Sequence, residues 1–534
     1  MSNVNPIRLL TLGLMLVLPL CPRKVQAIDG VVVRPAAWST ALAEWKNYRQ
    51  QQGHELLEID TGVGPQAIRA TIVQLASEHP RLRFVLLAGD VSSQAATNIG
   101  TFYPASTAMS QFGGEETIAS DNPYGDVDGD GIPELAVGRI PADSAEQLQG
   151  VLSRVMAYEQ QQDFSAWRRD VHVVAGVGGF GAVADSVIEM TTRQFLADRI
   201  PGWSAMTMTQ ANATSHYCPD PRRFSDTCIG RLNQGGMLWV YIGHGQVKTL
   251  DYVRAQEQWF PILGEEHLPL VDAGNRPPIA IFLACYTGAF DAVEDSLAET
   301  LVLRPGGPIA ALAASRVSGP YGLAMLSDGL LAQCFEEQVG TLGEIVLRAK
   351  QQLGKKNVPA AAAMAGGQMQ LISALAGALS PQGYNLEAER REHVWAMNLL
   401  GDPMLRVSHP GTLDLEEPAR VAPGEPLSLR GHSSAAGKLT MELAFRREQV
   451  RQELDNAAGD LATEAGCEQY QQRYLSANQP VLVSRELPIA AGAFEVQLPI
   501  PAELPPGRYA VRGFLEADGG WHVGYREVRV RPAQ

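Results

Sequence analysis

Residues 279–285 read IAIFLAC, and residues 237–245 read MLWVYIGHG. Each stretch is a short run of branched and aromatic side chains bounded by glycine or proline, a pattern that predicts two buried parallel strands. In an open α/β sheet, ligands bind in the crevice beyond the carboxyl ends of the strands. If the two strands are neighbours, His244 and Cys285 lie side by side in that crevice.

His244 and Cys285 together form the minimal apparatus for nucleophilic acyl transfer. The imidazole lowers the pKa of the thiol and later protonates the leaving amine. Taken singly, a cysteine that ends a strand is more often a small buried hydrophobe, and a histidine in a glycine-flanked turn is usually solvated. The pairing favours catalysis, because both residues follow strands and both have glycine or small neighbours that let a substrate backbone approach.

The whole chain, at 534 residues, is too long for one compact core. Strand and helix patterns alternate over residues 29–90, which predicts a parallel sheet. Asp170 begins a second α/β unit that holds both quoted strands and a further core strand at residues 308–314. Residues 323–400 follow a helical pattern. After Pro410, short alternating strands between Pro/Gly turns predict an antiparallel, immunoglobulin-like β-sandwich.

A glycine-rich turn at residues 176–181 follows the first strand of the second unit. Its glycine spacing does not fit G-x-G-x-x-G, and no acidic residue ends a strand about 20 positions later. We therefore interpret the turn as a substrate-pocket or packing turn, not as a dinucleotide site.

The two quoted stretches also resemble a known active-site signature. Residues 241–245 (YIGHG) and 282–291 (FLACYTGAFD) are similar to the gingipain family of cysteine peptidases, which belongs to the caspase-like clan. The likeness extends over roughly residues 28–410 through four further motifs, at residues 87–90, 120–139, 308–315 and 398–403. The resemblance implies a caspase-like α/β/α sandwich with a mostly parallel sheet in two subdomains, followed by the β-sandwich. The expected domains are residues 1–27 (signal peptide), 28–169 (N-terminal α/β subdomain), 170–410 (catalytic subdomain) and 411–534 (β-sandwich).

The resemblance implies a cysteine endopeptidase that acts on protein or peptide substrates. Cys285 would attack the peptide carbonyl to give a thioester, and His244 would activate the thiol. The backbone amides of Gly245 and Cys285 would bind the developing oxyanion. Two alternatives stay open: a catalytically silent exported binding or scaffold protein of the same fold, and a transpeptidase or ligase that uses the same nucleophile.

Two further positions bear on how far the resemblance extends. Gingipains orient the histidine with a glutamate before a Gly-Gly pair, where this chain has Val177. Either another acid supplies that hydrogen bond, or the pair works as a dyad. Asp185 is the nearest match to the aspartate that selects arginine before the scissile bond in this family, so the enzyme would prefer Arg or Lys there. An aspartate favoured by a helix dipole explains Asp185 equally well.

An acidic loop at residues 126–134 reads DVDGDGIPE. It resembles the first half of an EF-hand loop, although its glutamate comes too early for the twelfth position. Ca²⁺ requires six or more oxygen ligands, and clustered carboxylates repel one another unless a cation compensates. We therefore expect a structural Ca²⁺ ion here rather than a solvated acidic turn, and no organic cofactor. The candidate ligands are Asp126, Asp128, Asp130, Ile132 and Glu134.

Charge and the N-terminus restrict the partners and the compartment. The formal net charge of −15 argues against a nucleic-acid partner and against adhesion to anionic lipid. Arg8 precedes an apolar run over residues 9–20, and residues 25–27 offer a small-residue cleavage site. The run is shorter than the roughly 20 residues needed to span a membrane, which argues against an uncleaved anchor. We expect export to the periplasm, the cell surface or the medium, with no stable membrane insertion after the signal is removed.

Five of the six cysteines follow the expected signal peptide. Cys218 and Cys228 bracket a polar loop and are the expected disulfide pair in an oxidising compartment. Cys285 is the expected free thiol. Cys334, on a predicted helix, is a second candidate for an unpaired cysteine.

Overall fold

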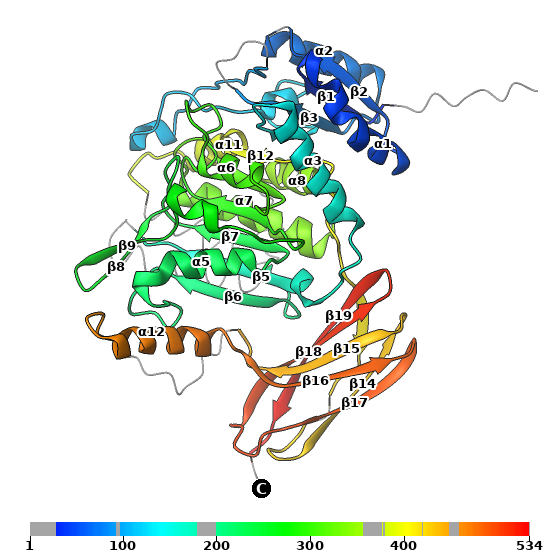
Figure 1. Ribbon diagram of the computed structural model, residues 1–534, viewed down its shortest axis with the longest axis vertical. Helices are drawn as coiled ribbons and strands as arrows, with labels where there is room; N and C mark the ends of the chain where they lie inside the picture. The colour runs from blue at the N-terminus through cyan, green and yellow to red at the C-terminus, as the bar shows by residue number, and fades with distance from the viewer. Residues whose placement is uncertain are drawn as a thin grey trace, which may run out of the picture.

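The computed structural model describes residues 28–62, 64–91, 97–178, 199–355, 376, 380–418, 420–447 and 459–532. Two bodies make up the described chain: a large α/β body and a smaller all-strand body at the C-terminal end (Figure 1). No described helix has both the length and the apolar character that a membrane span requires.

Ten strands form the central sheet of the α/β body, in the order β2-β1-β3-β4-β12-β11-β10-β7-β5-β6. The first half consists of four parallel strands, β1 (Gly30–Arg34), β2 (Leu56–Asp60), β3 (Phe84–Ala88) and β4 (Ala136–Ile140). The second half consists of five parallel strands, β5 (Asp170–Ala175), β6 (Ala205–Gln210), β7 (Leu238–Ile242), β10 (Ile279–Leu283) and β11 (Ala310–Ala314).

The strand β12 (Met397–Leu400) joins the two halves. It runs antiparallel to β11, and its Leu400 pairs with Arg139 of β4. The Arg139 guanidinium, at the carboxyl end of β4, lies over the Phe290 ring on the loop that follows β10. The carboxyl ends of the two halves therefore lie at the same edge of the sheet. The sequence pattern wrongly extended the preceding helix through residue 400. A four-residue strand that follows a helix directly carries too little pattern of its own.

Helices cover both faces of the sheet, as the continuous apolar character of its strands requires. They are α1 (Ala43–Gln51), α2 (Pro65–Glu78), α3 (Ala145–Gln160), α5 (Phe224–Asn233), α6 (Leu297–Leu303), α7 (Pro320–Leu331), α8 (Leu342–Gly354) and α11 (Leu386–Ala396). In β7, Leu238 and Val240 pack in one core with α7 and α8, whereas Trp239 and Tyr241 pack in another with α5 and α6. The α/β/α sandwich is thus confirmed.

Seven strands build the C-terminal body, in the order β16-β15-β18-β19-β13-β14-β17. They are β13 (Gly411–Leu415), β14 (Pro426–Ser433), β15 (Gly437–Ala444), β16 (Val481–Ile489), β17 (Gly492–Pro499), β18 (Gly507–Ala517) and β19 (Gly520–Val530). Along β14, buried and exposed residues alternate, as in a strand with one face on a core. This confirms the expected immunoglobulin-like β-sandwich.

One helix in this region was not predicted: α12 (Glu464–Ala477), which lies between β15 and β16 in sequence and packs on the α/β body (Figure 1). The Tyr474 hydroxyl is 2.9 Å from the hydroxyl of Thr209 and accepts a 2.7 Å hydrogen bond from Arg231. Gln256, at the tip of the hairpin formed by β8 (Tyr252–Ala255) and β9 (Gln258–Pro261), hydrogen-bonds the segment just before α12. The β-sandwich is therefore tied to the α/β body through side-chain contacts.

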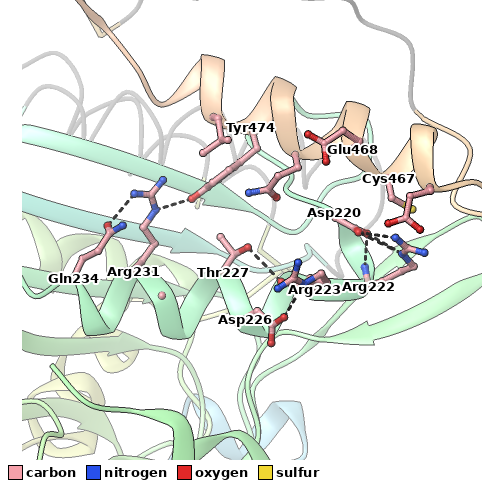
Figure 2. Close-up of a pocket in the computed structure, with 14 residues that line it drawn as sticks. Asp220, Arg222, Arg223, Asp226, Thr227, Arg231, Gln234, Cys467, Glu468 and Tyr474 are labelled. Atoms are coloured by element: carbon pink, nitrogen blue, oxygen red, sulfur yellow. Dashed lines mark hydrogen bonds and ion pairs between the residues drawn. The ribbon is translucent and has the colours of Figure 1, made fainter.

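A groove of about 390 Å³ lies between α5 and α12 (Figure 2). Its arginines are all engaged: Arg222 bonds Asp220, Arg223 bonds Asp226, and Arg231 bonds Tyr474 and Gln234. The residues that line it include neither of the two expected catalytic residues, so this groove is separate from the candidate active site.

Candidate active site

The turns that carry His244 and Cys285 leave the sheet at the same edge. Strands β7 and β10 are adjacent and parallel, and Ile242 lies opposite Leu283 in the register. The Gly243 amide also donates to the Leu283 carbonyl at 3.3 Å. The expected pairing of the two strands is therefore confirmed, and it places the histidine and cysteine turns next to each other.

Glycine makes the close approach of the two turns possible. A Cβ atom at Gly245 would lie 2.7 Å from the carbonyl oxygen of Cys285, a distance that no real side chain tolerates. Similarly, a Cβ at Gly243 would lie 3.0 Å from the Cα of Gly176, at the start of the glycine-rich turn. The Tyr241 hydroxyl donates to the His244 carbonyl at 2.7 Å and fixes the histidine turn from below. The described part of the glycine-rich turn, residues 176–178, therefore packs on the histidine turn.

Cys285 is half-buried, whereas His244 is exposed. The Cys285 sulfur accepts a hydrogen bond from the Ser318 amide at 3.3 Å and lies 3.7 Å from the Ser318 carbonyl. Burial raises the pKa of the Cys285 thiol, and the Ser318 amide only partly opposes this effect. The thiol in this environment therefore needs a base to become a nucleophile at neutral pH.

The residue after Cys285 has an unusual backbone conformation. Tyr286 has a φ angle of 58°, in the left-handed region that a bulky residue seldom adopts. Its hydroxyl donates to Glu115 at 3.0 Å, and its amide donates to the Arg316 carbonyl at 3.3 Å. The strained backbone is thus held from two sides, as is common at functional sites.

Arg316 clamps the loops around the thiol, a role that the sequence pattern did not reveal. Its guanidinium donates to both carboxylate oxygens of Asp291, at 2.7 and 2.6 Å, in a bidentate ion pair. Asp291 lies on the loop after Cys285, and Arg316 lies just before Ser318. The clamp therefore holds the cysteine loop against the segment that orients the cysteine sulfur.

The acidic loop brings three of its five candidate ligands together. Carboxylate oxygens of Asp126, Asp128 and Asp130 all lie within 4.8 Å of one another, and in the described part of the chain no other such group was found. Glu134 instead accepts a 2.7 Å hydrogen bond from the Val127 amide. The Ile132 amide donates to Asp130 at 2.8 Å. Burial, followed by Asp128 and Asp126, raises the pKa of Glu134.

Two other expectations have different outcomes. Asp185 lies outside the described residues, so its place relative to the thiol is not described. Val177, where gingipains have a glutamate, is half-buried and packs against the core formed with α5 and α6.

The expected Cys218–Cys228 disulfide is wrong. All five cysteines among the described residues are free thiols. Cys218 and Cys228 are both buried in the apolar core beside α5. Burial raises the pKa of Cys218 to about 12 and also raises that of Cys228. Both therefore act as small hydrophobic side chains, which is the usual role of a buried cysteine.

The fold defines the class of the protein, a caspase-like α/β/α sandwich with an attached β-sandwich. The model of Peptidase family C25 matches residues 23–408. The chain therefore belongs to this family, the gingipain family, and is a cysteine-type peptidase that acts on peptide bonds. No curated protein sequence matches it.

Three solved structures resemble almost the whole chain. The complex of the pro- and mature domains of Porphyromonas gingivalis RgpB is 15% identical with a TM-score of 0.51, covering 94% of this chain and 100% of that one. The Arg-specific cysteine proteinase gingipain R (RgpB) is also 15% identical with a TM-score of 0.51, over 95% and 99% of the two chains. A structure described only as a protease is 16% identical with a TM-score of 0.53, over 94% and 97%. At these identities the likeness supports the fold alone.

Proposed function

We propose that the protein is an exported cysteine endopeptidase in which Cys285 is the nucleophile and His244 its general base and acid. The observation that carries this proposal is the packing of the histidine turn on the cysteine turn, where Gly245 lies directly against Cys285. Both residues lie at the carboxyl edge of parallel strands, where substrates of α/β proteins bind.

In the proposed reaction, His244 takes the thiol proton, and the Cys285 sulfur attacks the carbonyl carbon of the scissile bond. The amides of Gly245 and Cys285 donate hydrogen bonds to the resulting oxyanion. His244 then gives its proton to the leaving amine, and a thioester remains on Cys285. Water, deprotonated by the same imidazole, hydrolyses the thioester and releases the acid product.

Thiol labelling tests this assignment. Iodoacetamide should alkylate Cys285 much faster at pH 7 than it alkylates the buried cysteines, and His244→Ala should remove that advantage. Peptide mapping by mass spectrometry gives the rate at each cysteine. Rapid labelling of Cys285 without any peptide hydrolysis would favour a silent binding protein. Transfer of the acyl group to an added amine in preference to water would indicate a transpeptidase or ligase.

We further propose a preference for Arg or Lys before the scissile bond. The structurally similar gingipain R is described as Arg-specific, and Asp185 is the candidate carboxylate for this pocket. Burying a guanidinium without a partner is costly, whereas a carboxylate fixes it through paired hydrogen bonds. Asp185→Asn should therefore lower kcat/KM for Arg substrates far more than for neutral ones. Equal losses on both would show that Asp185 only caps a helix.

A structural Ca²⁺ ion in the acidic loop is also proposed. The carboxylates of Asp126, Asp128 and Asp130 converge, and such hard oxygen donors suit this ion. Binding to the native state alone stabilises it, by about 2.7 kcal/mol at a hundredfold excess of Ca²⁺ over its Kd. Calcium should therefore raise the melting temperature, and Asp128→Ala should remove most of the increase. If chelation leaves the wild-type melting curve unchanged, the loop is only a turn.

Export is proposed from the N-terminal sequence, with the mature protein in the periplasm, on the surface or in the medium. Peptides or proteins are the proposed partners, and the acidic charge disfavours nucleic acid. N-terminal sequencing of exported protein should find Ile28 as the first residue. An intact N-terminus in the membrane fraction would instead indicate an uncleaved anchor.

A further inference from the structure

The N-terminus of α6 contacts both turns of the candidate active site. The Leu297 amide donates to the carbonyl of Val247, just after His244, at 2.6 Å. The next amide, that of Ala298, donates to the carbonyl of Thr287, just after Cys285, at 2.9 Å. Two successive amides of one helix therefore bind the histidine turn and the cysteine turn to each other.

A buried capping box fixes the start of this helix. The Glu299 carboxylate accepts a 2.7 Å hydrogen bond from the Ser296 amide, and the Glu299 amide donates to the Ser296 hydroxyl at 3.5 Å. Ser296 is fully buried and Glu299 is 2% exposed, which is unusual for a carboxylate with no cationic partner among the described residues. A solvated cap would serve the helix equally well, so burial of this one needs another explanation.

Several charged groups surround Glu299. Asp90 faces it from the loop after β3, and Asp295 precedes the helix. Arg139 and Asp143 face Asp90, and Lys248 faces Asp295. One oxygen of Asp90 is buried and has no hydrogen-bond partner among the described residues. The capping carboxylate therefore lies where the two halves of the sheet meet, in an acidic environment.

We propose that Glu299 and Ser296 are positioning residues for the peptidase reaction, because their capping box holds the start of α6 and α6 holds the His244 and Cys285 turns at a fixed separation. This inference rests on the proposed function, since it assigns a role relative to that pair. Neither residue touches the reacting atoms. A shift of about 1 Å between reacting groups costs on the order of 100-fold in rate, so loss of the cap should lower kcat and leave KM nearly unchanged.

The acidic surroundings add a pH dependence to this role. Burial, followed by the charge of Asp90, raises the pKa of Glu299 to about 8. Glu299 is therefore protonated at neutral pH and ionises as the pH rises through about 8. The ionised form repels Asp90 and Asp295 and loosens the start of α6. A glutamine at this position keeps the acceptor oxygen but cannot ionise.

The test compares Glu299→Ala and Glu299→Gln with a matched cap elsewhere. Thr463 caps α12 through a 3.0 Å hydrogen bond from the Gly466 amide, and α12 packs on β6 and α5, so Thr463→Ala is the control. Glu299→Ala should lower kcat by 10-fold to 100-fold and slow Cys285 alkylation to the rate of His244→Ala. Glu299→Gln should restore kcat and the rate of Cys285 alkylation. The kcat of this variant relative to wild type should rise between pH 7 and pH 9. Thr463→Ala should leave kcat unchanged.

Wild-type kcat and alkylation in Glu299→Ala would overturn the inference. If that variant does not fold, Glu299→Gln decides alone, and a constant ratio to wild type between pH 7 and pH 9 would refute the pH-sensitive role. Failure of the proposed function looks different: alkylation of Cys285 would then be independent of His244 even in the wild-type protein.

Discussion

The two halves of the central sheet are built alike but end differently. In the first half, the fully buried side chain of Arg139 in β4 occupies the carboxyl edge. Its guanidinium donates to both oxygens of Asp121 at 2.7 Å and to the carbonyls of Gly89 and Ile99. In the second half, β7 and β10 end in glycine-flanked turns that leave His244 exposed and Cys285 half-buried. Parallel strands alone therefore do not make a site. The candidate site lies where the turns beyond the strands bring polar side chains to the surface.

The largest expected effect is the loss of activity when the Cys285 thiol is removed from the second half. Cys285→Ala should lower kcat/KM by roughly 10⁶-fold, as removal of a protease nucleophile does. It should change the free energy of unfolding by less than about 1 kcal/mol, because it removes little core volume. Peptide hydrolysis and urea unfolding measure the two effects.

Cys334→Ala is the matched control for this variant. Cys334 is buried in the core beneath α7 and α8, so its loss should lower stability and spare activity. Full turnover by the Cys285 variant would contradict the proposed mechanism.

Removing Arg139 from the first half should mainly lower stability, whereas removing Cys285 from the second half mainly lowers activity. Arg139→Met leaves Asp121 buried without its cation, which should cost about 3–5 kcal/mol of unfolding free energy. The hydrogen bonds of Arg139 go to Asp121, Gly89 and Ile99, and it meets the loop after Cys285 by stacking on the Phe290 ring, so the kcat of the folded fraction should fall only a few-fold. Urea unfolding gives the stability, and active-site titration with an irreversible thiol reagent gives the folded fraction.

Adding Asp121→Asn to Arg139→Met should recover part of the loss, since the uncompensated charge is then gone. A large drop in kcat for the correctly folded variant would instead place Arg139 in the active site.

The smallest expected effect is on how stability depends on pH, through Glu299 at the contact between the halves. Because the native pKa of Glu299 is raised to about 8 from its ordinary 4.5, the native state holds a proton that the unfolded chain releases. Stability from this group is therefore fully present below pH 4.5, declines as the pH rises toward 8, and is constant above that. Glu299→Gln should show a flatter dependence of melting temperature on pH across this window. Parallel curves for the two proteins would show that Glu299 does not titrate in it.

Much of the second half of the sheet could be predicted, because the sequence of each segment by itself indicates the structure that the segment forms. The runs at residues 237–242 and 279–284 are apolar on both faces, which is the mark of a buried parallel strand, and glycines identify the turn that needs close approach. What could not be predicted depends on distant partners. Arg316 is an ordinary charged loop residue until Asp291 lies opposite it, and nothing near it in sequence signals the clamp.

The same reason explains the errors. Cys218 and Cys228 flank a polar loop, but the direction of a side chain is set by packing, and both turn inward to the core. In α12, Tyr470 and Tyr474 have helical spacing, yet the helix has its buried face because β6 and α5 lie against it. Residue patterns within a segment predicted its structure, whereas contacts between segments could not be predicted from the sequence.

The strand β12 also sets the order in which the chain can complete its fold. Its residues leave the ribosome after every other strand of the ten, yet it occupies the centre of the sheet between β4 and β11. Pairings so distant in sequence form slowly, because a long loop must close first. During synthesis, the two halves can therefore collapse separately but cannot pair through β12 until residue 400 has emerged. The groups that meet between the halves, Asp90 and Glu299 among them, come together only at that late step, so we expect a nascent chain to gain activity only once its sheet is complete.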